Sequence, residues 1–136
     1  MSDKSVSLRW TGEGLRFVGG AAGGPEIQLD SAGAEGPSPM DALLLSVAGC
    51  MAIDVVMILQ KGRVPLTSME IEVEGDRAQE PPRRFTAVRI VYRIGGLRKE
   101  HHARAQRAVE LSRDRYCSVL HTLRSDVDLD IRIDHL

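Results

Sequence analysis

Cysteine is scarce in this 136-residue sequence, which has only Cys50 and Cys117. The two lie far apart and form no CxxC pair. The opening residues, MSDKSVSLRW, lack the apolar run of a secretory signal. Small secreted proteins depend on many disulfides, whereas the cytosol keeps thiols reduced. We therefore expect a cytoplasmic protein without a disulfide framework.

An excess of charge of either sign is also lacking. Lys and Arg number 18 and Asp and Glu 19, a net charge of −1. Proteins that bind nucleic acid usually carry a basic face, so this balance gives no reason to expect such a partner. Aromatic residues make up only 4% of the chain, so Leu, Val, Ile, Met and Ala must build the core. The length suits a single domain, residues 1–136.

One segment, residues 40–59, is long and apolar enough to resemble a membrane span. However, Asp54 lies well inside it, and a carboxylate at the centre of a bilayer costs about 2.5–3.5 kcal/mol. We therefore interpret the segment as a buried core helix and expect no membrane partner. The helix is apolar on nearly every side, which a sheet of about six strands from one chain hardly covers. We therefore expect an obligate homodimer.

Alternating apolar and polar residues predict strands, and helical spacing predicts helices. The long helix should begin after Ser38 as N-cap, with Asp41 in a capping-box variant, and end at about Lys61 before Gly62. The other expected elements are strands at residues 6–10, 15–18, 26–30, 69–77, 85–94 and 127–133, and helices at 99–113 and 117–123. This order indicates the α+β class.

Each cysteine lies in an apolar stretch of helical character, which leaves two interpretations open. Free cysteine often merely packs in a core. For chemistry, the small residues Ala48 and Gly49 leave space beside Cys50, but Asp54, one turn along, would oppose a thiolate. A reactive Cys50 therefore needs a cation from elsewhere, for which Arg9 and Arg16 are candidates.

A zinc site is a third interpretation. His121 lies one helical turn after Cys117, and Cys50 with His101 or His102 would complete four ligands. No pair of these residues has a recognised zinc spacing, so we expect no metal and no other cofactor. The histidines are then surface or core residues.

Two motifs resemble the OsmC/Ohr family of osmotically inducible and organic hydroperoxide resistance proteins, and most of all its YhfA-like branch. The first comprises Ser38-Pro39-Met40-Asp41 and Ala48-Gly49-Cys50, and continues through Ile53-Asp54 to Gly62-Arg63; the second is Tyr116-Cys117-Ser118-Val119. The expected order of strands and helices resembles the family along essentially the whole chain. The resemblance implies an OsmC-like fold of antiparallel sheets with a long buried central helix, in an intertwined homodimer.

The resemblance also implies a thiol-dependent peroxidase that acts in the oxidative stress response and reduces organic hydroperoxides. By motif, Cys50 is the peroxidatic thiol, Cys117 the resolving thiol and Arg16 the activating cation. A dithiol reductant, for which lipoyl-type dithiols are candidates, would restore both thiols. Disulfide formation would require the two helices to meet, with Cα atoms within about 7 Å.

One departure from the family pattern supports an alternative function. Active hydroperoxide reductases place a glutamate directly after the proline of the first motif, where this chain has Met40. The alternative is a non-enzymatic small-molecule or thiol-ligand binding protein that keeps the fold.

Overall fold

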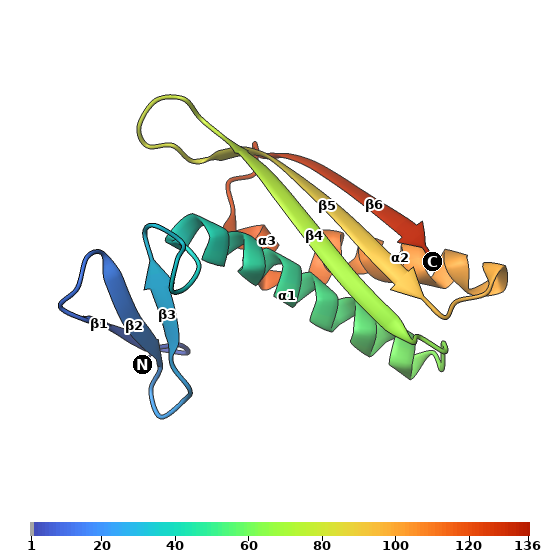
Figure 1. Ribbon diagram of the computed structural model, residues 1–136. Helices are drawn as coiled ribbons and strands as arrows, with labels where there is room; N and C mark the ends of the chain where they lie inside the picture. Colours follow the sequence, from blue (N-terminus) through green and yellow to red (C-terminus); the bar gives the residue numbers. More distant parts are fainter. Residues whose placement is uncertain (1) are drawn as a thin grey trace. The chain divides into compact units, whose positions relative to one another are not determined.

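The computed structural model describes residues 2–136 and has the α+β class expected from the sequence (Figure 1). Contacts within the chain divide it into two compact units, residues 2–43 and Leu44–Leu136. The expectation of a single domain over the whole chain stays a prediction.

The N-terminal unit contains a three-stranded antiparallel sheet in the order β1-β2-β3. Positive φ angles of 90° at Gly12 and 50° at Gly14 close the turn between the first two strands, a conformation that glycine adopts without strain. The register places Arg16 opposite Asp30. The strands are β1 (Val6–Trp10), β2 (Arg16–Ala21) and β3 (Ile27–Asp30), which confirms the predicted hairpin and the third strand.

Helix α1 (Pro39–Lys61) has the predicted bounds. At its start, the Ser38 hydroxyl oxygen accepts a hydrogen bond of 3.2 Å from the Asp41 amide, which confirms the N-cap. Immediately after it, Arg63 rather than Gly62 takes the left-handed conformation, with φ 55°. The Gly62 carbonyl oxygen accepts a 2.8 Å hydrogen bond from the Arg104 guanidinium, which binds the end of the helix to a later segment.

The C-terminal unit is built on a second three-stranded sheet, in the order β4-β5-β6. Strands β4 and β5 form the predicted antiparallel hairpin, and β6 lies parallel to β5. Parallel neighbours need a crossover connection, which the helical segments after β5 supply. Helices α1 and α2 lie on the same side of this sheet (Figure 1). The strands are β4 (Ser68–Arg77), β5 (Phe85–Gly95) and β6 (Asp128–His135).

The crossover differs from the two helices predicted for residues 99–113 and 117–123. A π-helical turn separates them. In it, the Cys117 amide donates a hydrogen bond of 2.9 Å to the carbonyl oxygen of Ser112, five residues earlier. Single π-helical turns are rare in proteins, but many of those that occur lie at functional sites. The segments are η1 (Lys99–His101), α2 (His102–Leu111), η2 (Ser112–Tyr116) and α3 (Ser118–Thr122).

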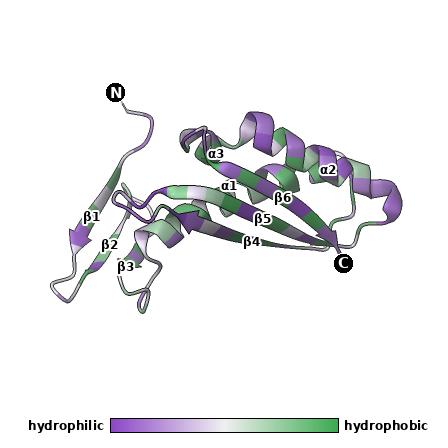
Figure 2. Cartoon of the chain, turned by 90° about the horizontal axis from the view of Figure 1, so that it is seen from above, coloured by the Kyte–Doolittle hydropathy of each residue, from purple (hydrophilic) through white to green (hydrophobic). Residues whose placement is uncertain are grey.

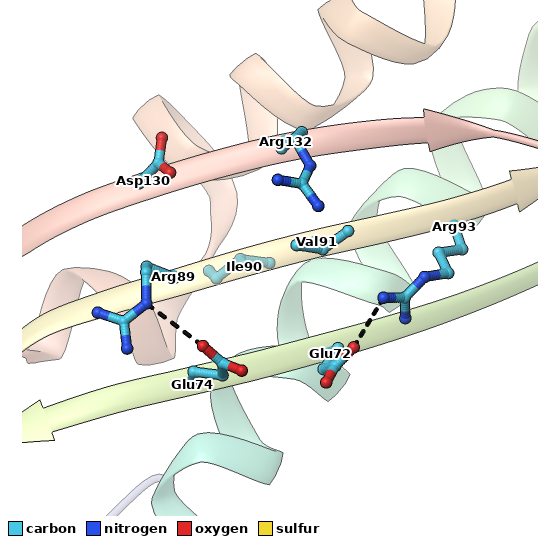
Figure 3. Close-up of a pocket in the computed structure, with 8 residues that line it drawn as sticks. All are labelled: Glu72, Glu74, Arg89, Ile90, Val91, Arg93, Asp130 and Arg132. Carbon is cyan, nitrogen blue, oxygen red and sulfur yellow. Dashed lines mark hydrogen bonds and ion pairs between the residues drawn. The ribbon is translucent and has the colours of Figure 1, made fainter.

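The two faces of the second sheet differ sharply, as the alternating hydropathy of its strands shows (Figure 2). The buried side chains of β5 are regularly spaced and apolar apart from one hydroxyl: Val88, Ile90, Tyr92 and Ile94. The opposite face forms a shallow hollow of about 290 Å³ lined mainly by charged residues (Figure 3). Within it, Arg89 pairs with Glu74 at 3.4 Å and Arg93 with Glu72 at 2.8 Å. This face is therefore a solvated surface of paired charges.

Only one side of α1 is covered within the chain. Its buried residues are Val47, Met51, Val55 and Leu59. In contrast, Leu45 and Ile53 are each 62% exposed, and Met57 is 50% exposed. By length and composition alone the helix could cross a membrane, with a mean hydropathy of 2.4 and 22% of that stretch buried. The C-terminal unit alone therefore does not bury this helix, and the expected partner subunit stays a prediction.

Candidate functional site: a cluster around two thiols

Cys50 lies midway along α1 and is partly exposed. Its neighbour Gly49 is exposed, with open space where a side chain would stand. The space inferred from the small residues before Cys50 is therefore present on the helix surface. Ile53, almost one helical turn further on, is an exposed apolar side chain.

Cys117 follows the π-helical turn η2 and directly precedes α3. Its side chain is fully buried, and its backbone is extended, with φ −72° and ψ 99°. The Leu120 amide donates a hydrogen bond of 3.3 Å to its Sγ atom. Cys117 therefore serves as the N-cap of a short helix, a position where side chains that accept hydrogen bonds are favoured.

The two cysteines, distant in sequence, act on one another electrostatically. Burial raises the pKa of the Cys117 thiol to about 11, although the Leu120 amide opposes this shift. A hydrogen bond and the charge of Cys50 raise this pKa further, as does the charge of Asp54. The meeting of the two thiol-bearing segments, implied by the family resemblance, is therefore present within the C-terminal unit. At neutral pH Cys117 is a thiol rather than a thiolate.

Asp54 finds its partner in the π-helical turn. The Ser112 hydroxyl donates a hydrogen bond of 2.8 Å to the Asp54 Oδ2 atom. Ser112 itself is fully buried. Asp54 lies on α1 one turn after Cys50, and Ser112 opens the turn that ends at Cys117. This bond therefore fixes the segment bearing one thiol against the helix bearing the other.

Tyr92 adds a hydroxyl to the same site. Its side chain extends from the inner face of β5 and is fully buried. Burial raises its pKa, and the charges of Cys117, Asp54 and Cys50 raise it further, in that order of size. We refer to the set Cys50, Asp54, Tyr92, Ser112 and Cys117 as the thiol cluster.

Sequence reasoning missed two members of the thiol cluster, Ser112 and Tyr92. The signal for Tyr92 was the alternation along residues 85–94, which places it on the same face as Ile90 and Ile94. Ser112 carries no comparable signal, because its contact with Asp54 spans 58 residues and depends on a π-helical turn.

The candidate arginines lie in the N-terminal unit, and each is paired there. Arg16, on β2, forms ion pairs with Glu13 at 3.4 Å and Asp30 at 3.7 Å. The buried Asp30 carboxylate also accepts the Ala32 and Glu35 amides at 3.0 and 3.1 Å, and these bonds lower its pKa. Arg9, on β1, pairs with Glu26 at 2.6 Å. The role of Arg16 beside Cys50 stays a prediction.

The residues of the zinc interpretation have other contacts. His121 is exposed, and its Nε2 atom lies 2.9 Å from the Arg113 carbonyl oxygen. The ring of His102 stacks on that of His135, with 3.5 Å between centroids. Within residues 2–136, no group of three or more His, Cys, Asp or Glu side chains is arranged to hold a metal ion.

Comparison with known proteins places this site in a family. The family model described as OsmC-like protein matches residues 32–132, which include the whole thiol cluster. The chain belongs to the OsmC-like family. Protein YhfA of Escherichia coli strain K12 is 41% identical over 123 residues, which cover 90% of each chain. The resemblance inferred from the two cysteine motifs is confirmed.

Solved structures of OsmC-like and similar proteins share the fold. A hypothetical protein from Aquifex aeolicus VF5 matches with a TM-score of 0.85 and 29% identity, over 100% of this chain and 98% of that one. An organic hydroperoxide resistance protein OsmC from Legionella pneumophila matches with a TM-score of 0.68 and 17% identity, over 98% of each chain. The second likeness establishes the OsmC-like fold alone.

Proposed function

We propose that this protein is a cysteine-based peroxidase that reduces organic hydroperoxides, with Cys50 as the peroxidatic and Cys117 as the resolving thiol. The observation that carries the proposal is the meeting of the only two thiols of the chain in one cluster. Membership of the OsmC-like family and likeness to a protein named for organic hydroperoxide resistance support it.

The different surroundings of the two thiols support the assignment of roles. Cys50 is partly exposed and Cys117 is not, so an organic hydroperoxide would reach Cys50 first. Cys117 is fully buried and remains protonated at neutral pH, which protects it from direct oxidation. Oxidation of Cys50 to a neutral sulfenic acid removes one charge that raises the Cys117 pKa. The resolving thiol therefore becomes easier to ionise when it is needed.

The reaction balances in three steps. The Cys50 thiolate attacks the terminal peroxide oxygen, the O–O bond breaks, and the departing alkoxide takes a proton to become an alcohol. The Cys117 sulfur then displaces the sulfenic oxygen, which leaves as water with the Cys117 proton. A dithiol reductant, with lipoyl-type dithiols as candidates, exchanges with the disulfide and restores both thiols.

The proposed function also involves a homodimer and a cation that activates Cys50. Arg16 would stabilise the Cys50 thiolate, since a nearby guanidinium lowers a thiol pKa. A homodimer in the cytoplasm would cover the exposed apolar side of α1, on which Leu45, Ile53 and Met57 lie.

The direct test offers the fully reduced protein cumene hydroperoxide with dihydrolipoamide as reductant. The wild type should turn over continuously, and more slowly with hydrogen peroxide. Cys50→Ser should consume no peroxide. Without the reductant, Cys117→Ser should consume one equivalent and stop with Cys50 as a sulfenic acid. A reduced wild-type protein that leaves all peroxides intact would refute the proposal.

A further inference from the structure

The hydroxyl of Tyr92 is buried without a hydrogen bond. Its Oη atom has no partner among the residues that the structure describes, although the side chain is 0% exposed. Buried hydroxyl groups are nearly always paired, because leaving one unpaired is costly. An exception at a site with two thiols therefore needs an explanation in terms of what the site binds.

The position of Tyr92 indicates which group it would bind. The side chain lies on the inner face of β5, opposite Ile71 and Ile133 in the register of the sheet. The surrounding acidic groups are Cys117, Asp54 and Cys50, and Cys117 has the greatest effect of the three. Because its pKa is raised, Tyr92 keeps its proton at neutral pH and can donate a hydrogen bond.

Asp54 is already engaged in the resting protein. Its Oδ2 atom accepts the Ser112 hydroxyl at 2.8 Å. Neither sulfur atom accepts from Tyr92, since its hydroxyl has no partner within residues 2–136. An atom that arrives during the reaction can therefore accept a hydrogen bond from Tyr92 without displacing an existing one. Under the proposed function, the atom newly introduced beside both sulfurs is the peroxide oxygen that Cys50 retains.

We propose that Tyr92 is a catalytic residue whose hydroxyl donates a hydrogen bond to the sulfenic oxygen of oxidised Cys50 and so speeds its displacement by Cys117. The inference rests on the proposed function and adds a hydrogen-bond donor for its second step. As the Cys117 sulfur bonds to the Cys50 sulfur, the S–O bond breaks and charge develops on the departing oxygen. Tyr92 stabilises that charge, the Cys117 proton completes the water molecule, and Tyr92 ends with its own proton.

Tyr92 is expected to act in the second step of the reaction and not in the first. Tyr92 and Cys117 are both fully buried, and Cys117 exerts the largest of the three charge effects on the Tyr92 hydroxyl. Neither sulfur accepts from Tyr92 in the described residues, so its acceptor exists only once Cys50 carries an oxygen, which is when the second step begins.

The test compares Tyr92→Phe with Tyr116→Phe. Tyr116 is the only other tyrosine and is exposed, so it provides a matched control. Each reduced protein is mixed rapidly with cumene hydroperoxide, and mass spectrometry follows the dimedone adduct of Cys50 and the Cys50–Cys117 disulfide separately. Tyr92→Phe should oxidise Cys50 within about twofold of the wild-type rate but form the disulfide at least roughly tenfold more slowly. Tyr116→Phe should match the wild type in both steps.

Thermal melting provides a second measurement on the same variants. Because the Tyr92 hydroxyl has no partner among residues 2–136, Tyr92→Phe should melt at or above the wild-type temperature. If Tyr92→Phe fails to fold, 3-fluorotyrosine placed at residue 92 in the Tyr116→Phe background keeps the shape and changes only the acidity of the hydroxyl. The rate of disulfide formation should then change with that acidity, while Cys50 oxidation stays the same.

Three results would overturn the inference. Disulfide formation at the wild-type rate in Tyr92→Phe would show that Tyr92 has no part in this step, and the proposed peroxidase function would still stand. A markedly lower melting temperature in that variant would indicate a structural hydrogen bond instead. A wild-type protein that forms neither adduct nor disulfide would refute the proposed function and the inference together, and the wild-type measurement separates this case from the first two.

Discussion

The hydroxyl of Ser112 donates a hydrogen bond of 2.8 Å to the carboxylate of Asp54, across 58 residues of sequence. Asp54 lies one helical turn after Cys50, and Ser112 accepts the Cys117 amide through its carbonyl oxygen. One serine is therefore bonded to the helix of the first thiol and to the backbone of the second. The contact holds together the two segments whose thiols must meet in the proposed reaction.

Removing either partner of this bond should lower stability and slow disulfide formation. Ser112→Ala leaves the Asp54 carboxylate without its buried donor, which costs about 1–3 kcal/mol in the free energy of unfolding. Chemical denaturation of Ser112→Ala, Asp54→Ala and the double variant would give the coupling energy between the two residues. We expect a coupling of about 1 kcal/mol or more. Strictly additive effects would contradict the role of this bond.

The Cys117 thiol should titrate far above the ordinary cysteine range. In Cys50→Ser it is the only thiol, so thiolate absorbance reports it alone. Its pKa should lie below the value of about 11 in the intact pair, since the hydrogen bond and charge of Cys50 are lost, but above the ordinary 8.5 because burial remains. A pKa at or below about 8.5 in Cys50→Ser would contradict the buried environment described for Cys117.

The same pKa shift makes stability depend on alkaline pH. Folding raises the Cys117 pKa, so the folded state favours the protonated thiol. The stabilisation is fully present below the unfolded value near 9 and is lost as pH rises through about 11. Melting temperatures between pH 8 and 11 should fall more steeply for the wild type than for Cys117→Val. Parallel curves for the two proteins would contradict the shift.

Local sequence patterns predicted the elements better than their assembly. Alternation located all six strands, and Ser38 located the start of α1, because both signals lie within a few residues. The sheet of about six strands was wrong, since the chain forms two sheets of three. Which strands pair is decided by contacts distant in sequence, which alternation does not specify.

The sequence predicted only part of the thiol cluster. Composition and spacing left Cys50 and Cys117 undecided between packing and chemistry, and the family resemblance brought them together. The π-helical turn at Ser112 was missed because it depends on tertiary contacts, including the bond to Asp54. Tyr92 was read as an ordinary strand residue, since a sequence does not reveal whether a buried hydroxyl has a partner.

The exposed side of α1 should hold two subunits together. Light scattering after gel filtration should give twice the chain mass of 14.9 kDa for the wild type. Ile53→Glu places a charge in that apolar surface and should yield a monomer, because an unpaired charge in an interface is costly. Gln60→Glu, on an exposed polar position of the same helix, is the control and should stay dimeric. A monomeric wild type that floats with lipid vesicles would assign this surface to a membrane instead.

The final prediction concerns the cation that activates Cys50. Arg16→Ala should slow the reaction of Cys50 with cumene hydroperoxide at neutral pH roughly tenfold or more, a loss of about 1.4 kcal/mol in thiolate stabilisation. Arg9→Ala is the matched control, because Arg9 lies in the same sheet and forms an exposed ion pair of small energetic value. Trp10, the only tryptophan, reports by fluorescence whether that sheet stays folded in each variant. Equal rates for the two folded variants would remove Arg16 from the site and leave Cys50 to be activated by another group.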